Sequence, residues 1–257
     1  MLQEERYQRI RALLASFTRL SAERIAKDLG VSRETTRRDL VALEALGELR
    51  RIHGGVVLNQ PEAEPPFERR LKSHHREKRA IAKAAVRLLK SGHTVFLDAG
   101  STTLIMTEEL VSLSGLTVLT NGLEIATRMA AAGGAERGNR VIVLGGELMR
   151  GVPATCGAAT VAEIGRYRAD LALLSPVAVH PSEGASDFDL DEAAVAQAMC
   201  DAAERRIILA DHSKIGMRSR RCFCPAKRID VLVTNQAARK HPEFAGFADT
   251  GIEVVLA

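Results

Sequence analysis

The chain has 257 residues, 46% of them apolar and 26% charged, a globular composition with room for one or two domains. No apolar run approaches the roughly 20 residues that a membrane-spanning helix needs, and the mixed charges of the first ten residues are unlike a secretory signal, so we expect a cytoplasmic protein without membrane contact. The net charge of +4 favours a polyanionic partner, and its excess is N-terminal, because residues 1–60 hold 11 Lys and Arg against 8 Asp and Glu.

The patterns of cysteine and histidine argue against a disulfide framework and against a metal. The chain has four cysteines: Cys156, Cys200, Cys222 and Cys224. Two of them flank Phe223 but lack the second ligand pair of a structural zinc site. His53 and His212 have no companions at metal-ligand spacing. We therefore expect reduced thiols, no metal and no cofactor.

The N-terminal part predicts three helices. Apolar residues at i, i+3, i+4 and i+7 indicate an amphipathic helix over residues 3–17. A second helix begins at Ser21, which can cap it, and ends at Gly30. The two residues that follow leave room only for a sharp turn into a third helix, over residues 33–46. Two short helices joined by a tight turn are typical of a helix-turn-helix.

The third helix has one apolar and one basic face. Ser32 can cap it by accepting the N–H of Glu34 or Thr35. On a helical wheel Thr36, Leu40 and Leu43 share the packing face. The opposite face carries Glu34, Arg37, Arg38 and Val41, with Arg33 and Thr35 on the flanks. A solvated face is the usual fate of an arginine pair, but the cap and the preceding helix favour DNA recognition.

A predicted hairpin completes this domain. Residues 48–52 and 56–58 are strand-like and are separated by a turn at His53, Gly54 and Gly55. The sequence therefore predicts a winged helix-turn-helix over residues 1–60, whose third helix enters the major groove of DNA. The expected DNA contacts are Ser32, Arg33, Thr35, Thr36, Arg37, Arg38, Arg51 and His53.

The prolines at positions 61, 65 and 66 predict a linker over residues 61–73, followed by an α/β domain over residues 74–257. Continuous apolar runs alternating with helical segments indicate a mostly parallel sheet covered on both faces. The predicted strands are 94–97, 116–120, 140–144, 170–174, 205–210, 229–233 and 252–256. The predicted helices are 74–90, 101–112, 122–132, 159–167 and 189–204.

Small and polar residues follow the predicted strands, at the edge where α/β sheets bind ligands. They are Asp98, Gly100, Ser101, Thr102, Thr103, Asn121, Gly145, Gly146, Glu147, Asp211 and Lys214. The turn at 98–103 offers hydroxyls and helix N–H groups to a phosphate, and Lys214 can neutralise an anion. One such turn alone is more often structural. Several at one edge favour a pocket for a phosphorylated sugar or polyol.

The recognition-helix run SRETTRRDL, the wing RIHGG and the turn DAGST together resemble the DeoR family of bacterial transcription regulators, over essentially the whole chain. The resemblance implies a sensor domain like sugar-phosphate isomerases of the ribose-phosphate type, and adds Glu192 to the expected ligand contacts. The run 186–193 is similar to part of glycerol-3-phosphate regulon repressors, so glycerol 3-phosphate is the first expectation for the effector. Ser175 and Pro176 stand where that family usually has a glycine-rich turn.

The resulting hypothesis is a repressor of a carbohydrate or polyol operon, a homo-oligomer (dimer or tetramer) that binds double-stranded operator DNA and is released by its effector. One alternative is an isomerase-like enzyme carrying a DNA-binding module, with Asp98, Glu147, Asp211 and Lys214 as its chemical groups. Another is a constitutive architectural DNA-binding protein, which would leave the polar strand ends unexplained.

Overall fold

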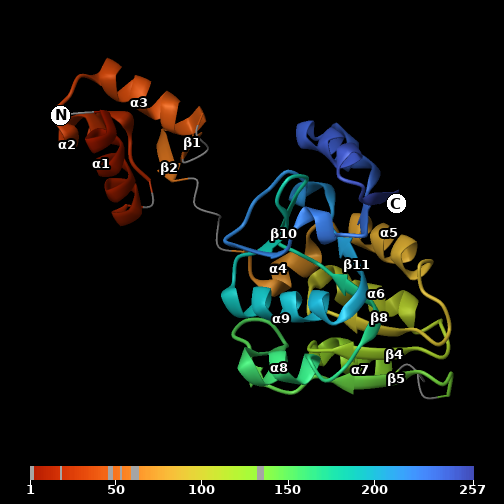
Figure 1. The fold of residues 1–257 in the computed structure, drawn as a ribbon. Coiled ribbons are helices and arrows are strands. Elements are labelled where there is room, and N and C mark those ends of the chain that lie inside the picture. Colours follow the sequence, from red (N-terminus) through yellow and green to blue (C-terminus); the bar gives the residue numbers. More distant parts are fainter. Residues whose placement is uncertain (1–2, 18, 46–48, 53, 59–63, 132–135) are drawn as a thin grey trace. The chain divides into compact units, whose positions relative to one another are not determined.

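The computed structural model describes residues 3–17, 19–45, 49–52, 54–58, 64–131 and 136–257 (Figure 1). Contacts divide the chain into two compact units, residues 1–62 and 63–257. His53, one of the predicted DNA contacts, and residue 46, the last of the predicted third helix, lie outside the described residues.

The first unit contains the predicted three helices and hairpin. Its elements are α1 (Gln3–Ser16), α2 (Ala22–Leu29), α3 (Arg33–Ala45), β1 (Leu49–Ile52) and β2 (Gly55–Leu58). The two strands pair antiparallel, with Leu49 opposite Leu58. Leu20 and Val56 exchange backbone hydrogen bonds of 3.1 and 2.8 Å, which join the hairpin to the segment before α2.

The predicted helix caps are confirmed. Ser21 accepts a hydrogen bond from the backbone N–H of Arg24 at 3.2 Å, and Gly30 ends α2 with a φ of 65°. Ser32 accepts from the N–H of Thr35 at 3.1 Å. Because capping side chains satisfy N–H groups that a helix leaves free, these short helices have defined ends.

The core of this unit forms where α3 packs against α1 and α2. Ile10, Ile25 and Leu43 are fully or almost fully buried there. Asp39 is also buried, and its carboxylate accepts two hydrogen bonds from Arg6, at 2.6 and 3.0 Å. The ion pair satisfies a carboxylate that burial would otherwise destabilise, and it fixes α3 on α1.

The second unit is an α/β fold. Its helices are α4 (Phe67–Lys72), α5 (His75–Val86), α6 (Ser101–Leu110), α7 (Leu123–Ala131), α8 (Gly157–Ile164) and α9 (Leu190–Asp201). The strands of its main sheet are β3 (Thr94–Leu97), β4 (Thr117–Thr120), β5 (Arg140–Val143), β8 (Ala169–Leu174), β11 (Ala203–Leu209), β13 (Val231–Thr234) and β14 (Glu253–Leu256).

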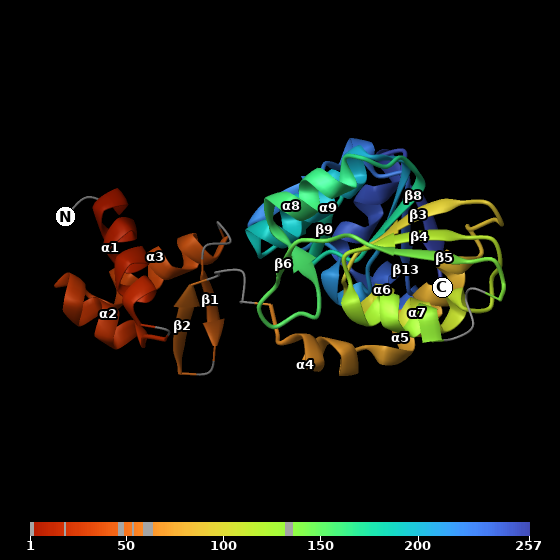
Figure 2. The same cartoon turned by 90° about the horizontal axis from the view of Figure 1, so that it is seen from below.

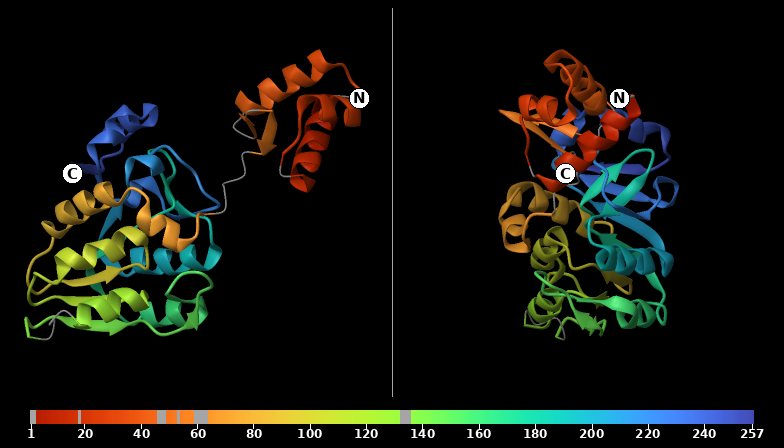
Figure 3. Two further views of the ribbon diagram at one scale, coloured as in Figure 1. Left: turned by 180° about the vertical axis from the view of Figure 1, so that it is seen from behind. Right: turned by 90° about the vertical axis from the view of Figure 1, so that its left-hand side faces the viewer.

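The main sheet has the order β14-β13-β11-β8-β3-β4-β5, and every neighbouring pair is parallel. Helices α5, α6 and α7 cover one face and α8 and α9 the other (Figures 2 and 3). Alternate strand residues serve the two layers: Val95 and Leu97 pack with the first set of helices and Phe96 with the second. The predicted parallel sheet with two covered faces is confirmed.

Two groups of short strands were not predicted. One is the antiparallel sheet of β9 (Ala178–His180), β10 (Gly184–Asp187) and β12 (Arg221–Cys224), and the other is the pair β6 (Glu147–Leu148) and β7 (Thr155–Cys156). They are too short to show an apolar period, and β9 and β10 are buried along their whole length, so no alternation marks them.

Part of the predicted linker is helical. Residues 67–72 form α4, whose Phe67 is buried against the α/β core, and the predicted helix 74–90 is the shorter α5. Pro66 precedes α4 and its carbonyl accepts the N–H groups of Arg69 and Arg70. A proline pair ends an extended segment but is also suited to begin a helix.

Within the described residues, no helix is both long and apolar enough to cross a membrane.

Shortening the buried side chain of Leu43 to alanine is expected to destabilise the first unit by about 2–5 kcal/mol, because it leaves a cavity under α3. Val41 lies on the same helix but is 45% exposed, so Val41→Ala should change stability by no more than about 0.5 kcal/mol. Urea unfolding followed by circular dichroism measures both. Equal effects of the two substitutions would contradict the packing of α3.

Candidate functional site

The second unit has one topological switch point. From β3 the chain moves outward to β4 and β5, then returns to β8 on the other side of β3 and continues to β11, β13 and β14. Connections therefore leave the carboxyl ends of β3 and β8 in opposite directions. Such a switch point opens a crevice, where open α/β sheets bind their ligands.

Asp98 ties the two sides of this crevice together. Its carboxylate accepts the backbone N–H of Gly100 at 3.2 Å and that of Ser175 at 2.6 Å. Gly100 is required at this approach, since a Cβ there would lie 2.6 Å from the Cβ of Ser175. Burial raises the pKa of Asp98, and these hydrogen bonds act in the opposite direction.

A small cavity of about 30 Å³ lies in the crevice. Its walls come from the ends of β3, β4 and β8, from β10 and α9, and from the segment that begins the unit. It is lined by Glu64, Arg70, Asp98, Ala99, Gly100, Asn121, Met149, Ser175, Asp187, Glu192, Val195 and Ala196.

One wall of the cavity is acidic. The Asp187 carboxylate accepts the N–H of Val177 at 2.8 Å, and burial and the neighbouring Glu192 raise its pKa well above the usual range. Asp189 caps α9 by accepting the N–H groups of Asp191 and Glu192, which places Glu192 at the cavity. Burial, then the charge of Glu64, raises the pKa of Glu192 to about 7. These carboxyl groups can accept or donate hydrogen bonds to hydroxyls.

A buried cation, Lys78, lies beside the start of α6, which follows the cavity-lining Gly100. Gly100 provides no side-chain cap, so the first N–H groups of α6 are not capped from that position. Lys78, on α5, is only 2% exposed, and its Nζ donates to the Ser101 hydroxyl at 3.0 Å and to the Arg70 carbonyl. Burial, reinforced by the charge of Lys214, lowers the pKa of Lys78 to about 8. Helix dipole and lysines together suit an anion.

Several buried polar atoms around the cavity lack a partner. Across the described part of the chain, six buried side-chain nitrogen or oxygen atoms make no hydrogen bond. Three belong to lining residues: Arg70 Nε, Asn121 Oδ1 and Ser175 Oγ. A fourth, Thr102 Oγ1, lies in the first turn of α6. Such atoms are costly unless something supplies the missing bonds, so their convergence indicates a ligand site.

The structure brings together only part of the predicted effector set. Asp98, Gly100, Asn121 and Glu192 line the cavity. Five others do not line it: Ser101, Thr102 and Thr103 in the first turn of α6, and Asp211 and Lys214 at the two ends of the short helical turn that follows β11. Lys214 donates to the Pro176 carbonyl, whereas Asp211 accepts from Ser213. After burial, the charge of Lys214 lowers the pKa of Lys78 and that of Asp211 raises it.

Three predicted residues lie away from the cavity. Gly145 and Gly146 follow the edge strand β5, and Gly146 packs closely against Thr160 and Cys156. Glu147, on β6, is exposed. Contact with the effector was predicted for them because they directly follow a strand. That strand, β5, lies at the edge of the sheet, two strands from the switch point.

Sequence reasoning missed Glu64, Arg70, Lys78 and Asp187. The first two lie in the predicted linker, Lys78 lies in the middle of a predicted helix, and Asp187 lies on an unpredicted strand. Two of them had a detectable signal. Lys78 occupies the apolar face of α5, four residues before Ala82, and Asp187 lies in the run 186–193 that resembles glycerol-3-phosphate regulon repressors.

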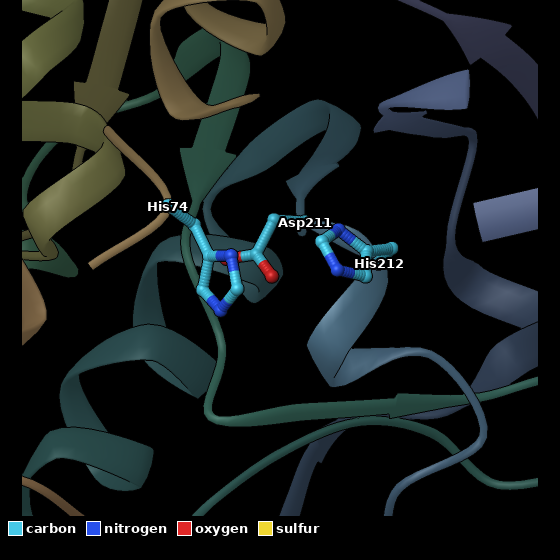
Figure 4. Close-up of side chains that lie close together, drawn as sticks. All are labelled: His74, Asp211 and His212. Atoms are coloured by element: carbon cyan, nitrogen blue, oxygen red, sulfur yellow. The ribbon is translucent and has the colours of Figure 1, made fainter. Parts of the chain in front are cut away.

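His212 has no companion at metal-ligand spacing in the sequence, but the structure brings two other potential ligands close to it. His74, which precedes α5, packs edge-on against His212 with ring centroids 5.0 Å apart, and Asp211 lies between them (Figure 4). Potential ligand atoms of the three lie within 4.8 Å of one another. A tertiary contact assembles this group, so sequence spacing could not reveal it.

The surroundings of the group do not favour a cation. The oxygen of the Asn235 side chain accepts the His212 backbone N–H at 2.8 Å, so its NH₂ group faces His212 Nδ1 at 3.2 Å and leaves the ring proton on Nε2. Burial alone would raise the pKa of Asp211, but the hydrogen bonds from Ser213 and the charge of Lys214 hold it below its ordinary value. A positive charge therefore already faces this carboxylate. We assign no metal here, and the expected absence of one stays a prediction.

The first unit presents the predicted basic face. Arg37 and Arg38 on α3 are exposed, and both pair with Glu34, at 3.1 and 3.3 Å. Their exposed fractions are 62% and 78%, so another anion can reach them. The hydrogen bond from Arg37 lowers the pKa of Glu34.

The remaining predicted DNA contacts differ in accessibility. Arg33 and Ser32 are exposed, Thr35 is half-buried, and Arg51 is exposed on the hairpin and pairs with Glu44 at 3.1 Å. Thr36 is fully buried, and its hydroxyl donates to the Ser32 carbonyl at 3.2 Å. Its inclusion among the DNA contacts was wrong, because it lies on the packing face with Leu40 and Leu43.

The raised pKa of Glu192 predicts a pH-dependent stability. Its folded pKa of about 7 exceeds the ordinary 4.5, so its stabilising contribution is complete below about pH 4.5 and is lost as pH rises through about 7. Glu192→Gln is expected to raise the free energy of unfolding by about 1–3 kcal/mol at about pH 8 and to leave it unchanged near pH 4. Urea titrations measure this. The exposed neighbour, changed as Asp191→Asn, should lack the effect, and equal pH profiles would refute the assignment.

Each of the two units matches a known protein family. The family described as DeoR-like helix-turn-helix domain matches residues 6–62, and that described as DeoR C terminal sensor domain matches residues 73–236. In the fold alone, ribose 5-phosphate isomerase A of Methanocaldococcus jannaschii is similar, with a TM-score of 0.41 and 17% identity over 56% of this chain and 55% of that one. The chain thus spans about half the length of that structure.

Two relatives are similar over nearly the whole chain. The HTH-type transcriptional regulator GolR of Listeria innocua is 32% identical, with 98% of each chain covered. The glycerol-3-phosphate regulon repressor of Escherichia coli is 27% identical, over 91% of this chain and 92% of that one. Together with the two matched domains, this likeness shows that the chain belongs to the DeoR family of transcription regulators.

Proposed function

We propose that the protein is a repressor whose α3 and wing bind double-stranded operator DNA and whose α/β unit binds a phosphorylated sugar or polyol that releases it. The observation that carries the effector site is the convergence of unpaired buried polar atoms, from Arg70, Asn121 and Ser175, on one cavity at the switch point. Domains at residues 1–60 and 74–257, with assembly into a homo-oligomer that presents two DNA-binding units, belong to this proposal.

The chemistry of the cavity supports the effector class. The start of α6, with Arg70 at the cavity and Lys78 bonded to Ser101, suits a phosphate, and the carboxyl groups of Asp98, Asp187 and Glu192 suit hydroxyls. A small molecule with a phosphate at one end and hydroxyls at the other fits this polarity. Glycerol 3-phosphate is the first candidate because the Escherichia coli relative is named for it.

The enzyme alternative is less well supported. Of its four proposed groups only Asp98 lines the cavity, whereas Glu147 is exposed and Asp211 and Lys214 are bonded to neighbours. The relatives compared are named as transcriptional regulators. Turnover of aldose and ketose phosphates by the purified chain would restore the alternative.

The DNA interface predicts a salt-sensitive role for Arg38. On duplex DNA selected from a random pool by the wild-type chain, Arg38→Ala is expected to weaken binding and to reduce the slope of log affinity against log salt by about 1 if Arg38 contacts a phosphate. Fluorescence anisotropy over a salt series measures both. Arg166, 75% exposed in the α/β unit, provides the control Arg166→Ala. Unchanged binding by Arg38→Ala would reject the interface.

The effector site predicts stabilisation by phosphorylated polyols. Glycerol 3-phosphate at about 100 times its Kd should stabilise the chain by about 2.7 kcal/mol and release bound DNA, whereas glycerol should not. Lys78→Met keeps the length of the buried side chain and removes the charge beside Ser101, so it should fold and lose this stabilisation. Thermal denaturation and anisotropy provide the readouts. If no compound in a panel of sugar and polyol phosphates shifts the melting temperature, the effector class is wrong.

A further inference from the structure

The cavity at the switch point is separated from a larger one by a partition of four side chains. The second cavity, of about 220 Å³, lies between residues 64–67, the turn at 149–152 and the start of α9. Both cavities share the residues of the partition: Glu64, Arg70, Met149 and Glu192. The cavity at the switch point, of about 30 Å³, is the smaller of the two, so an opening of the partition would give a phosphorylated polyol more room beside the crevice.

An ion pair forms the polar part of this partition. Arg70 Nη1 donates to Glu64 Oε1 at 2.6 Å, and each side chain is only 13% exposed. Arg70 Nε, also at the cavity, has no partner. The guanidinium therefore uses only part of its bonding capacity, whereas a phosphate could accept two parallel bonds from it.

Neighbouring carboxyl groups make the position of the Glu64 carboxylate electrostatically unfavourable. Glu64, Asp98, Asp187 and Glu192 place four carboxyl groups on the lining of one small cavity with Arg70 as the cation among them. Burial is the main cause of the raised pKa of Glu192, and Glu64 is the second. Moving Glu64 outward would relieve this repulsion, and Arg70 is what holds it in place.

We propose that Arg70 is an anion-binding residue of the effector site and that Glu64 is its built-in competitor. The anionic group of the effector replaces the Glu64 carboxylate on Arg70, at the side where Lys78 donates to the Arg70 carbonyl and Ser101 begins α6. The expelled side chain opens the partition and joins the two cavities. The inference rests on the proposed function, which it deepens by naming the event that admits the effector.

The position of Glu64 connects this exchange to DNA binding. Glu64 is the second residue of the unit that starts at Ala63, directly after the boundary with the DNA-binding unit. In the ligand-free state the ion pair anchors the start of the α/β unit to α4. Because the effector and the Glu64 carboxylate compete for one guanidinium, effector binding and anchoring exclude each other, which gives the differential affinity that a switch requires.

The test uses the full chain and inorganic phosphate in calorimetric titrations. Glu64→Gln removes the competing charge and is expected to bind phosphate about fivefold more tightly than the wild type, the scale of one modest ion pair. The control is Glu68→Gln, at an exposed position of α4, the helix that carries Arg70, and it should match the wild type. Arg70→Gln should bind phosphate about tenfold more weakly because a two-bond anion contact is lost. Equal affinities of Glu64→Gln and wild type, or full affinity of Arg70→Gln, would overturn the proposal.

DNA affinity without any effector provides a second readout. Glu64→Gln mimics the released state, so it should bind the selected duplex more weakly than wild type and Glu68→Gln. Wild-type DNA binding by Glu64→Gln would reject the connection through this pair. If Lys78→Met abolishes phosphate binding while Glu64→Gln and Arg70→Gln leave it unchanged, the effector site stands and this inference fails. If neither wild type nor any variant binds phosphate, both fail.

Discussion

The carboxylate of Asp98 is the contact on which the arrangement of the α/β unit's site depends. It accepts N–H groups from Gly100 and Ser175, which follow β3 and β8, the two strands that flank the switch point. This tie brings the uncapped start of α6 to the crevice that the diverging connections leave open. A side chain at position 100 would collide with Ser175. The cavity therefore forms because of the order of the strands, and the hydrogen bonds of Asp98 hold its two sides together.

In each unit a glutamate forms an ion pair with arginine side chains that could otherwise bind an external anion. Glu34 pairs with Arg37 and Arg38 on α3, and Glu64 pairs with Arg70 beside the cavity. The α3 groups are more than half exposed, so water screens them and their exchange for DNA phosphates costs little. The Glu64–Arg70 pair is only 13% exposed on each side, so breaking it without a replacement anion costs far more. The two kinds of ion pair therefore differ in how much free energy it costs to break them.

The large elements of the fold were readable because their signals are local. Caps at Ser21 and Ser32, the glycine at the end of α2 and seven apolar runs each reflect the chemistry of a few consecutive residues, and the structure has a helix end or strand at each. The antiparallel strands β9, β10 and β12 escaped because all three residues of β9 and all four of β10 are buried, which removes alternation. Helix α4 was not predicted because a pair of prolines can indicate either a break in regular structure or the start of a helix.

By itself the sequence determined the two units, the parallel sheet, the basic face of α3 and four lining residues, Asp98, Gly100, Asn121 and Glu192, the last through family resemblance. The order of the strands was decided only in the tertiary structure, and it placed Gly145, Gly146 and Glu147 away from the cavity because β5 lies at the sheet edge. The same assembly brought Glu64 and Arg70 to the cavity, Lys78 to Ser101 and His74 to His212. The physical reason is that periodicity and capping act over a few residues, whereas burial and ion pairing join side chains that only the packed sheet and helices make neighbours.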